Sequence, residues 1–490
     1  MLINWLPALP VVLPLFVAAI LVVCYQHPRV QAWIAGIAGG MFFVIAVVIF
    51  HYVLQGAVLT SSFGGWSAPF GVVFSIDRLS AIMLLVTAIM TLLTLLYGLS
   101  SIDSGSRHPL TLPLMFGLIT GVQGAFITAD IFNWYVWFEV MLICSLGLLA
   151  IGRRGAQLDA AFKYLALNIF GTLLMLFAVA MIYGATGQLN FAALRASYAM
   201  WSESTRIWLL SLLALGFLVK SGAFPVFAWL PASYHTLPAP LLALFAALLT
   251  KVGIYAILRS YGDIFIPTPE ILLSALGWLA VATMLFGVLG ATYHWDMRRI
   301  FGFLIISTVG NILLAVALGS ANGNIAAIFY MLQDILVKAN LFFMAGLIAS
   351  LAGSYDLRQI GGLYNTAPWL AILFAIPALS MIGIPPFSGF WAKILVLQES
   401  IAQGRVIWAA AIIVVSVLTM YAMMKIWFGA FAKPHPSVDK QIWYPNAIKG
   451  QSFAVLSIVI LAALTLYISF VPQRLYQYVS SSVEQMEHGQ

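Results

Sequence analysis

Long apolar windows alternate with short polar connections along the whole chain. A helix needs about 20 residues, at 1.5 Å each, to cross about 30 Å of hydrocarbon. Windows of this kind cover residues 4–24, 31–54, 79–100, 110–129, 131–151, 162–184, 207–230, 240–259, 270–292, 300–318, 325–350, 367–402, 406–428 and 451–471. The pattern predicts an all-α polytopic membrane protein with about 14 transmembrane helices.

Two of these windows contain helix-breaking residues. The stretch Leu215–Lys251 is interrupted at Pro225 and passes His235 before an apolar helix resumes. The twelfth window is too long for one simple span, and Pro385 and Pro386 help to divide it into two half-helices. Backbone groups freed inside a membrane are tolerated only against protein or a water-filled cavity. Both breaks therefore indicate an ion path.

The remaining pattern predicts the organisation of the chain. Residues 1–105 form an N-terminal three-helix segment, in which the β-prone, Gly/Pro-punctuated residues 64–77 predict a small hairpin on the outer surface. Residues 106–262 form a first five-helix repeat of spans four to eight, and residues 263–430 an inverted second repeat. Residues 431–490 hold a cytoplasmic loop, the last span and an external tail.

The repeat is predicted from charged residues that recur at nearly one spacing. The spacings are 175, 173 and 174 residues for Asp159–Lys163 with Asp334–Lys338, Lys220 with Lys393, and Lys251 with Lys425. Corresponding elements are five spans apart, and an odd number inverts one copy in the membrane. Inverted units with broken helices place a transport site at mid-membrane.

The basic residues of the loops predict the orientation. Eleven Lys and Arg lie in odd-numbered loops, against six in even-numbered loops and the C-terminal tail. Cytoplasmic loops carry the excess of basic residues. We therefore expect both termini outside, with the N-terminal window retained as the first span because it lacks a basic region and a cleavage site.

Composition confirms the class and excludes others. Of the 490 residues 63% are hydrophobic and 8% charged, whereas soluble domains carry about 25% charged residues. The net charge of +7 comes without a basic run, so it does not indicate nucleic-acid binding. Cys24 and Cys144 lie far apart in apolar spans and favour neither a disulfide nor a metal pair. Because no nucleotide, metal or redox motif appears, we expect no cofactor.

Ionisable residues inside the spans are the candidate functional groups. A charged side chain at the bilayer centre costs about 2.5–3.5 kcal/mol on insertion scales. Glu139 lies about 12 Å deep, since it is eight residues into its span. Our hypothesis is that Glu139 and Lys220 form an ion pair that opens and closes as protons move; the alternative is a static pair that locks two helices.

Lys251, Lys338 and Lys393 extend this set into a predicted proton relay across the midplane. Lysine suits a relay because it can alternate between charged and neutral forms when it is buried; the alternative is a set of structural cations. A local i, i+4 pair with Lys338 accounts for Asp334. Lys425 is as well explained by snorkelling to the membrane edge. His235 either passes protons between a lysine and water or is an ordinary loop histidine.

These residues resemble a known family. The chain is similar to the antiporter-like membrane subunits in five features: the break WLPASYHTLPAP, the following LLTKVGIYAILR, the segment GIPPFSGFWAK, Glu139 and Lys220. That family includes subunits of respiratory complex I, membrane-bound hydrogenases and multisubunit Mrp cation/proton antiporters. The stretches GGWSAPFGVVFSIDRLSA and FAWLPASYHTLPAPLLALFAALLTKVGIYAILR resemble the D-type subunits of the Mrp antiporters most closely.

The resemblance implies a proton-translocating subunit of a hetero-oligomeric antiporter in a prokaryotic cell membrane, exchanging Na⁺ (or Li⁺ or K⁺) for H⁺. It implies that Glu139 and Lys220 are a regulatory pair near the proton entrance, Lys251 and Lys338 the central relay, and Lys393 its terminal site. No carboxylate cage for Na⁺ is visible, which favours protons in this subunit and sodium elsewhere. The competing functions are a proton-pumping subunit of a redox-driven complex, a scaffold subunit and a stand-alone antiporter.

Overall fold

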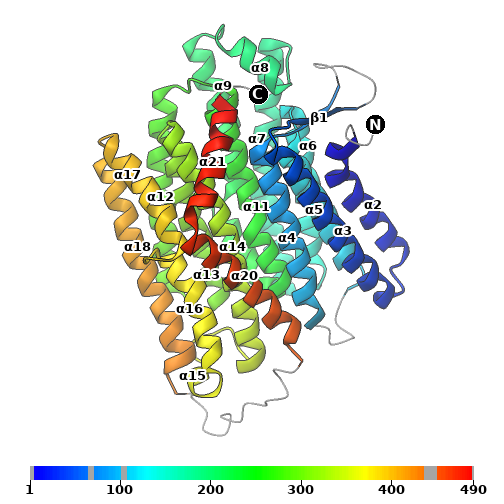
Figure 1. The fold of residues 1–490 in the computed structure, drawn as a ribbon, viewed down its shortest axis with the longest axis vertical. Helices are drawn as coiled ribbons and strands as arrows, with labels where there is room; N and C mark the ends of the chain where they lie inside the picture. The colour runs from blue at the N-terminus through cyan, green and yellow to red at the C-terminus, as the bar shows by residue number, and fades with distance from the viewer. Residues whose placement is uncertain (1–4, 64–70, 101–107, 435–449, 488–490) are drawn as a thin grey trace.

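The computed structural model describes residues 5–63, 71–100, 108–434 and 450–487, which form a bundle of long helices (Figure 1). The long helices are α2 (Leu9–Val23), α3 (Pro28–Leu54), α4 (Arg78–Ser100), α5 (Thr111–Ile127), α6 (Ile131–Ala150), α7 (Gly155–Thr186), α9 (Glu203–Ser221), α11 (Ala239–Arg259), α12 (Glu270–Tyr293), α13 (Met297–Ala317), α14 (Ala321–Ala352), α16 (Pro368–Ile382), α17 (Ser388–Ala402), α18 (Val406–Trp427), α20 (Ser452–Phe470) and α21 (Pro472–Glu487). Short helical elements are η1 (Leu6–Ala8), α8 (Phe191–Tyr198), α10 (Trp229–Ser233), η2 (Tyr234–Thr236), η3 (Ser260–Ile264), α15 (Leu363–Thr366) and η4 (Phe428–Ala432).

Each apolar window of the sequence overlaps one of these long helices or, in the twelfth window, a pair of them, while the seventh window also runs through the first break into α10. Among the described residues, 12 helices are long and apolar enough to cross a membrane. Helices α5 and α16 are apolar but shorter. The protein is therefore an all-α polytopic membrane protein, as predicted, while the count of 14 spans stays a prediction.

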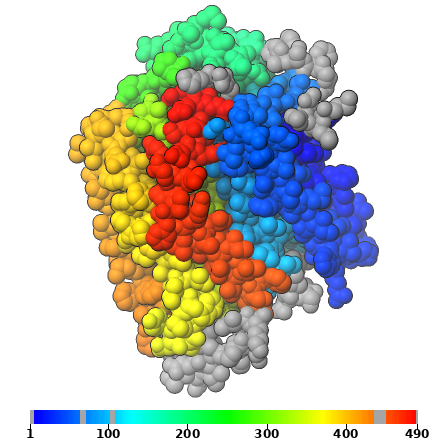
Figure 2. Space-filling view, viewed as in Figure 1, coloured from blue at the N-terminus to red at the C-terminus, as the bar shows by residue number. Residues whose placement is uncertain are grey.

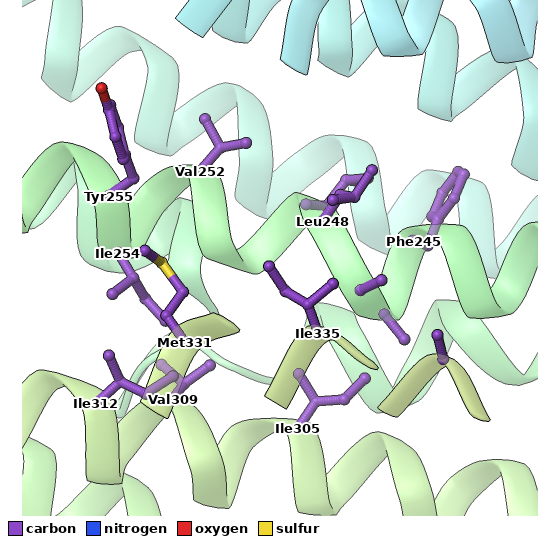
Figure 3. Close-up of a cluster of buried hydrophobic side chains, with 14 of the residues drawn as sticks. Phe245, Leu248, Val252, Ile254, Tyr255, Ile305, Val309, Ile312, Met331 and Ile335 are labelled. Carbon is purple, nitrogen blue, oxygen red and sulfur yellow. The ribbon is translucent and has the colours of Figure 1, made fainter. Parts of the chain in front are cut away.

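Three helices form the centre of the bundle. The apolar windows of α11, α13 and α14 are 100%, 94% and 83% buried, against 39% in α7 and α18. Helices that are apolar all round belong in the interior. In Figure 3 side chains of the three helices meet between them: Ile254 of α11 lies near Met331 of α14 and near Val309 and Ile312 of α13.

Both predicted helix breaks are present and share one local geometry. Helix α9 ends before Gly222 and α16 before Gly383, and these glycines have φ of 72° and 85°. Glycine adopts this left-handed conformation readily, which is why it ends helices. A cis X–Pro bond follows in each break, at Phe224–Pro225 and at Pro385–Pro386.

The geometry of the breaks corrects one detail of the predicted repeat. The two glycines are 161 residues apart, whereas Lys220 and Lys393 are 173 apart. Lys220 therefore lies before the first break, whereas Lys393 lies after the second break. The spacing of the two lysines predicted equivalent positions, and relative to the breaks their positions differ. The inverted repeats themselves stay a prediction.

A short hairpin overlaps the predicted segment 64–77, but its first strand lies before that segment. Strand β1 (Leu59–Ser62) pairs antiparallel with β2 (Val73–Ile76), with Leu59 opposite Ile76. Residues 64–70 of the predicted hairpin lie outside the described residues, as do residues 435–449 of the predicted cytoplasmic loop. The hairpin, the start of α2 and the end of α21 lie at the same end of the bundle (Figure 1). Which end faces outward stays a prediction.

The predicted C-terminal tail contains a packed helix, α21. Val479, Val483 and Met486 are buried. The Tyr478 hydroxyl donates to the carbonyl of Arg78 at 2.7 Å, and the Arg78 amide donates to Gln485 Oε1 at 3.0 Å. Figure 2 shows this red segment crossing the surface between the blue N-terminal helices and the yellow helices of the second half.

Candidate ion-translocation site

Lys220 lies at the end of α9, directly before the first break. Its side chain is buried, and the ammonium donates to Thr172 Oγ1 at 2.6 Å and to the carbonyl of Asn168 at 3.0 Å. Both acceptors belong to α7, along which α9 packs. The ring of Phe138 lies 6.0 Å from the same nitrogen, within the range of a cation–π contact.

Glu139 does not form the direct ion pair with Lys220 that the sequence predicted. No salt bridge within 4.0 Å joins these two described residues, although the charge of Glu139 acts on Lys220 through space. The physical reason is that the Lys220 side chain reaches α7, whose acceptors satisfy it. The structure thus holds the pair open, and its role in transport stays a prediction.

A small cavity adjoins Lys220. Its volume is about 20 Å³, and Phe138, Tyr164, Asn168, Lys220, Trp229 and Leu249 line it. A space of about 10–15 Å³ can hold one water. The cavity is therefore large enough to hold one water beside Lys220.

Lys251 forms the most deeply buried ion pair of the described residues. Its ammonium lies 2.7 Å from Asp334 Oδ2, and neither side chain has any exposed surface. The ammonium also donates to the carbonyl of Ala246 at 3.1 Å, and Thr308 donates to Asp334 Oδ2 at 3.2 Å. The pair joins α11, α13 and α14 at the centre of the bundle.

This pair overturns the local explanation of Asp334. The sequence assigned its carboxylate to Lys338 one turn away, but the carboxylate turns to Lys251 on another helix. Lys338 is fully buried, and its ammonium has no hydrogen-bond partner among the described residues. Asp334, Lys251 and Lys393 all act on Lys338 through their charges. A polar atom so placed needs a water or a change of protonation.

Lys393 lies on α17 and closes the second break. Its ammonium donates to the carbonyls of Ile382 and Met381, at 2.7 and 3.2 Å, and to Ser416 Oγ at 3.0 Å. The last carbonyls of α16 have no partner within their own helix, and they carry the negative end of the helix dipole. A cation is therefore held by the broken helix itself.

The remaining predicted residues lie at the edges of the bundle. The His235 ring contacts the carbonyl of Pro231 at 3.0 Å and Arg299 Nη2 at 3.4 Å, and no described lysine is among its partners. Lys425 is half-buried at the end of α12 and donates to the carbonyls of Thr292 and His294 at 2.9 and 2.5 Å, and its snorkelling to the membrane edge stays a prediction. Lys163 pairs with Asp159 at 2.6 Å on the exposed surface.

A second charged cluster was missed by the sequence analysis. Arg259, the last residue of α11, lies 2.5 Å from Asp77 and 3.0 Å from Asp263, and Arg195 pairs with Asp263. Both arginines were among the six basic residues assigned to the even-numbered loops and the C-terminal tail. Eight residues separate Arg259 from Lys251, so both share one face of α11, and that spacing was the available signal.

No metal centre is found in the described part of the chain, which contains no group of three or more His, Cys, Asp or Glu side chains placed to hold an ion. Cys24 and Cys144 are both unpaired thiols. The chemistry that these residues offer is proton transfer among amines, carboxylates and hydroxyls.

Lysines buried on four helices, beside two helix breaks, define a class: membrane subunits that translocate ions. The family described as "NADH:quinone oxidoreductase/Mrp antiporter, TM" matches residues 128–419. The chain is 37% identical to the D-type subunit of the Na(+)/H(+) antiporter of Alkalihalophilus pseudofirmus over 487 residues, which is 99% of this chain and 97% of that protein. It is 35% identical to the corresponding protein of Bacillus subtilis, covering 92% of each. The protein belongs to this NADH:quinone oxidoreductase/Mrp antiporter family.

Solved structures agree with this assignment. A chain of the Mrp complex from Dietzia sp. DQ12-45-1b superposes with a TM-score of 0.90 at 30% identity, covering 99% of this chain and 98% of that one. A chain of an archaeal membrane-bound sulfane sulfur reductase gives 0.89 at 25% identity, covering 99% and 98%. Respiratory complex I from Thermus thermophilus shares the fold, with a TM-score of 0.82 at 23% identity, covering 98% and 99%.

Proposed function

We propose that this chain is the D-type, proton-translocating subunit of a multisubunit Na⁺/H⁺ antiporter. The observation that carries the proposal is the row of buried lysines, Lys220, Lys251, Lys338 and Lys393, through the middle of the bundle. A scaffold would gain nothing from their insertion cost. The assignment to Na⁺/H⁺ antiport is supported by the names of the two relatives, which are both Na(+)/H(+) antiporter subunits.

The proposed relay begins at Glu139 and Lys220 and passes through Lys251 and Lys338 to Lys393. The water-sized cavity beside Lys220 supports the first step. The unpartnered ammonium of Lys338, between the Lys251–Asp334 pair and Lys393, supports the central steps. The proposed route carries protons and not Na⁺, because Na⁺ needs a set of oxygen ligands such as carboxylates. Three of the four buried lysines have no described carboxylate within ion-pair distance.

The partners of the proposal are the other subunits of a hetero-oligomeric antiporter, H⁺, Na⁺ and the lipid bilayer of a bacterial cell membrane. Large apolar side chains on the outer faces, such as Trp33, Phe162 and Trp208, are 70–75% exposed. Lipid and partner subunits both accept such faces.

The test is Na⁺-dependent dissipation of a preset pH gradient in everted vesicles from an antiporter-deficient host. Wild-type complex should dissipate the gradient, and Glu139→Gln or Lys220→Ala should abolish this while the subunits still copurify. Lys163→Ala is the matched control, because it removes a lysine whose side chain is 53% exposed. Wild-type activity in an assembled Lys220→Ala complex would overturn the proposal.

The likeness to the sulfane sulfur reductase chain supports a second candidate, a proton-pumping subunit of a redox-driven complex. The same vesicles distinguish the two functions. If the wild-type complex moves no protons with Na⁺ but pumps them when a reductant is added, the redox function replaces the antiport.

A further inference from the structure

A large cavity opens at the end of the bundle that is predicted to face the cytoplasm. Its volume is about 720 Å³, and it lies among the ends of α4, α5, α11 and α14 and the connection from α6 to α7. We call it the vestibule. Its lining includes the exposed residues Arg154 and Ser350, so water reaches it from that side.

The described lining of the vestibule is not suited to binding a metal cation. Arg154, Arg298 and His108 lie on its wall, and among its described lining residues there is no carboxylate. Hard cations such as Na⁺ are bound by sets of oxygen ligands in which carboxylates are prominent. A proton crosses such a space by hopping along water.

Tyr97 of α4 lies at the inner wall of the vestibule. Its side chain is 3% exposed, and its hydroxyl donates to the carbonyl of Phe343 on α14 at 3.0 Å. The two rings stack at 4.4 Å with an angle of 16° between their planes. A Cβ on Gly346 would lie 2.6 Å from the tyrosine oxygen, so the ring fits only because this residue is glycine.

Unpartnered polar atoms lie along α14 beyond this stacked pair. Both amide atoms of Asn340, the ammonium of Lys338 and Asp334 Oδ1 are buried without a hydrogen-bond partner among the described residues. Lys338 and Gly346 are eight residues apart, about 12 Å along the helix. A few waters, each held by polar groups such as these, would span that distance.

Resting on the proposed function, we infer that the vestibule is a cytoplasmic exit that branches from the proton route at Lys338, ahead of its last lysine Lys393, and that Tyr97 is the gate of this exit. With Tyr97 stacked on Phe343, Lys338 is cut off from the vestibule. When the ring swings away and its hydroxyl leaves the Phe343 carbonyl, water reaches Asn340 and Lys338. The Lys338 ammonium then gives its proton to water and becomes a neutral amine.

Cysteine accessibility in the intact complex tests the gate. Cys24 and Cys144 are first replaced by Ser. Asn340→Cys then reports the space beyond Tyr97, and Ser350→Cys reports the vestibule. A membrane-impermeant methanethiosulfonate reagent is added to everted vesicles, whose cytoplasmic face is outward. We expect Ser350→Cys to react in every background and Asn340→Cys to react slowly when Tyr97 is present.

Tyr97→Ala should raise the reaction rate of Asn340→Cys by about tenfold or more, because a minor open state is typically about 0.1–10% populated. Tyr97→Phe keeps the ring but loses the hydroxyl bond, and should give an intermediate rate without the folding risk of the alanine. Tyr478→Ala is the matched control, since its hydroxyl also donates to a backbone carbonyl, at the opposite end of the bundle; it should change nothing.

Equal rates with Tyr97 and with the Tyr97→Ala substitution, or no reaction of Asn340→Cys in either while Ser350→Cys reacts, would overturn the gate. Labelling needs no ion gradient, so it fails separately from the proposed function. If Lys220→Ala abolishes antiport while the labelling rate of Asn340→Cys is the same with and without the Tyr97→Ala substitution, only the gate is wrong. If Lys220→Ala leaves antiport intact, the relay is wrong whatever the labelling shows.

Discussion

At the scale of single residues, the Lys251–Asp334 pair shows what a buried charge requires. Both side chains are fully buried at 2.7 Å. Removing one partner of such a pair leaves an uncompensated charge, at a cost of about 3–5 kcal/mol, whereas replacing both with apolar residues is often neutral.

We therefore expect Lys251→Met to lower the free energy of unfolding of the purified complex by about 3–5 kcal/mol. The double variant Lys251→Met/Asp334→Leu should recover most of that loss and still lack antiport. Denaturant titration and the vesicle assay together measure the two effects. A single variant as stable as wild type would show that the pair is not closed in the membrane.

His235 gives a prediction on pH. Burial, and next the positive charge of Arg299, hold its pKa below the ordinary value. The folded protein thus favours the neutral ring, whose stabilising effect is complete above the unfolded pKa of about 6.5 and is lost as the pH falls through the lower folded pKa. His235→Gln should lose less stability than wild type between about pH 6.5 and pH 5.

Thermal denaturation of the complex across that pH range measures the difference. Because the His235 partners are Pro231 and Arg299, with no described lysine among them, antiport should persist in His235→Gln at pH above about 7. Loss of antiport there, with the complex assembled, would return His235 to the proton route.

Asp334 marks the limit of residue-level prediction. Spacing along one helix made Lys338 its obvious partner, because residues four apart are neighbours on the helix surface. Its actual partner is set by how α11 packs against α14, and nothing in the local sequence encodes that. The same limit hid Tyr97, whose hydroxyl and ring both contact a different helix.

At the scale of elements, the two helix breaks were predictable from the sequence. Substituting the glycine that ends a helix tests whether the break is needed for antiport. Gly383 has φ of 85°, and a Cβ there would lie 2.7 Å from Lys393 Cδ. Gly187 also has a positive φ, of 66°, but a Cβ there meets nothing within 4 Å. An L-residue in this conformation costs about 1–2 kcal/mol.

Gly383→Ala and Gly187→Ala should therefore destabilise the complex by a similar amount, while only Gly383→Ala reduces antiport, because only it displaces Lys393 from the carbonyls of α16. Antiport rates normalised to assembled complex test this. A similar loss of antiport in both variants would mean that Lys393 need not stay at the end of α16.

Helix α21 was not predicted, because the low hydropathy of its residues indicates only that they do not span the membrane and not whether they form a helix. Residues after 471 are too polar for a span, so the sequence predicted a tail. Yet Val479, Val483 and Met486 recur at spacings of four and three, which is the pattern of a helix with one apolar face. The pattern was available, but the surface that it covers, on α4 and α14, exists only after the bundle has formed.

At the scale of the whole molecule, the sequence predicted the fold class, both helix breaks and the lysines because each rests on a local signal. Twenty apolar residues, a proline in a span or a lysine at mid-membrane has few physical explanations. The contacts between distant segments had no such signal. Asp77 and Arg259 are 182 residues apart and join the start of α4 to the end of α11.

That cluster carries the last prediction. Arg259 is buried between Asp77 and Asp263, so Arg259→Met leaves two buried carboxylates without this partner and should cost about 3–5 kcal/mol of stability. Arg405→Met breaks the more exposed pair with Glu270, whose side chains are 36% and 69% exposed, and should cost about 1 kcal/mol or less.

Acid distinguishes the two pairs further. Burial opposes the ionisation of Asp77, but Arg259 and hydrogen bonds from Arg259 and Ser80 hold its pKa below the ordinary value. The stability that this gives is present above the unfolded pKa of about 3.9 and lost as the pH falls through the folded pKa. Arg259→Met should therefore flatten the acid side of the stability profile, measured by denaturant titration, and Arg405→Met should leave it unchanged. Equal profiles would show that the cluster does not hold α4 to α11.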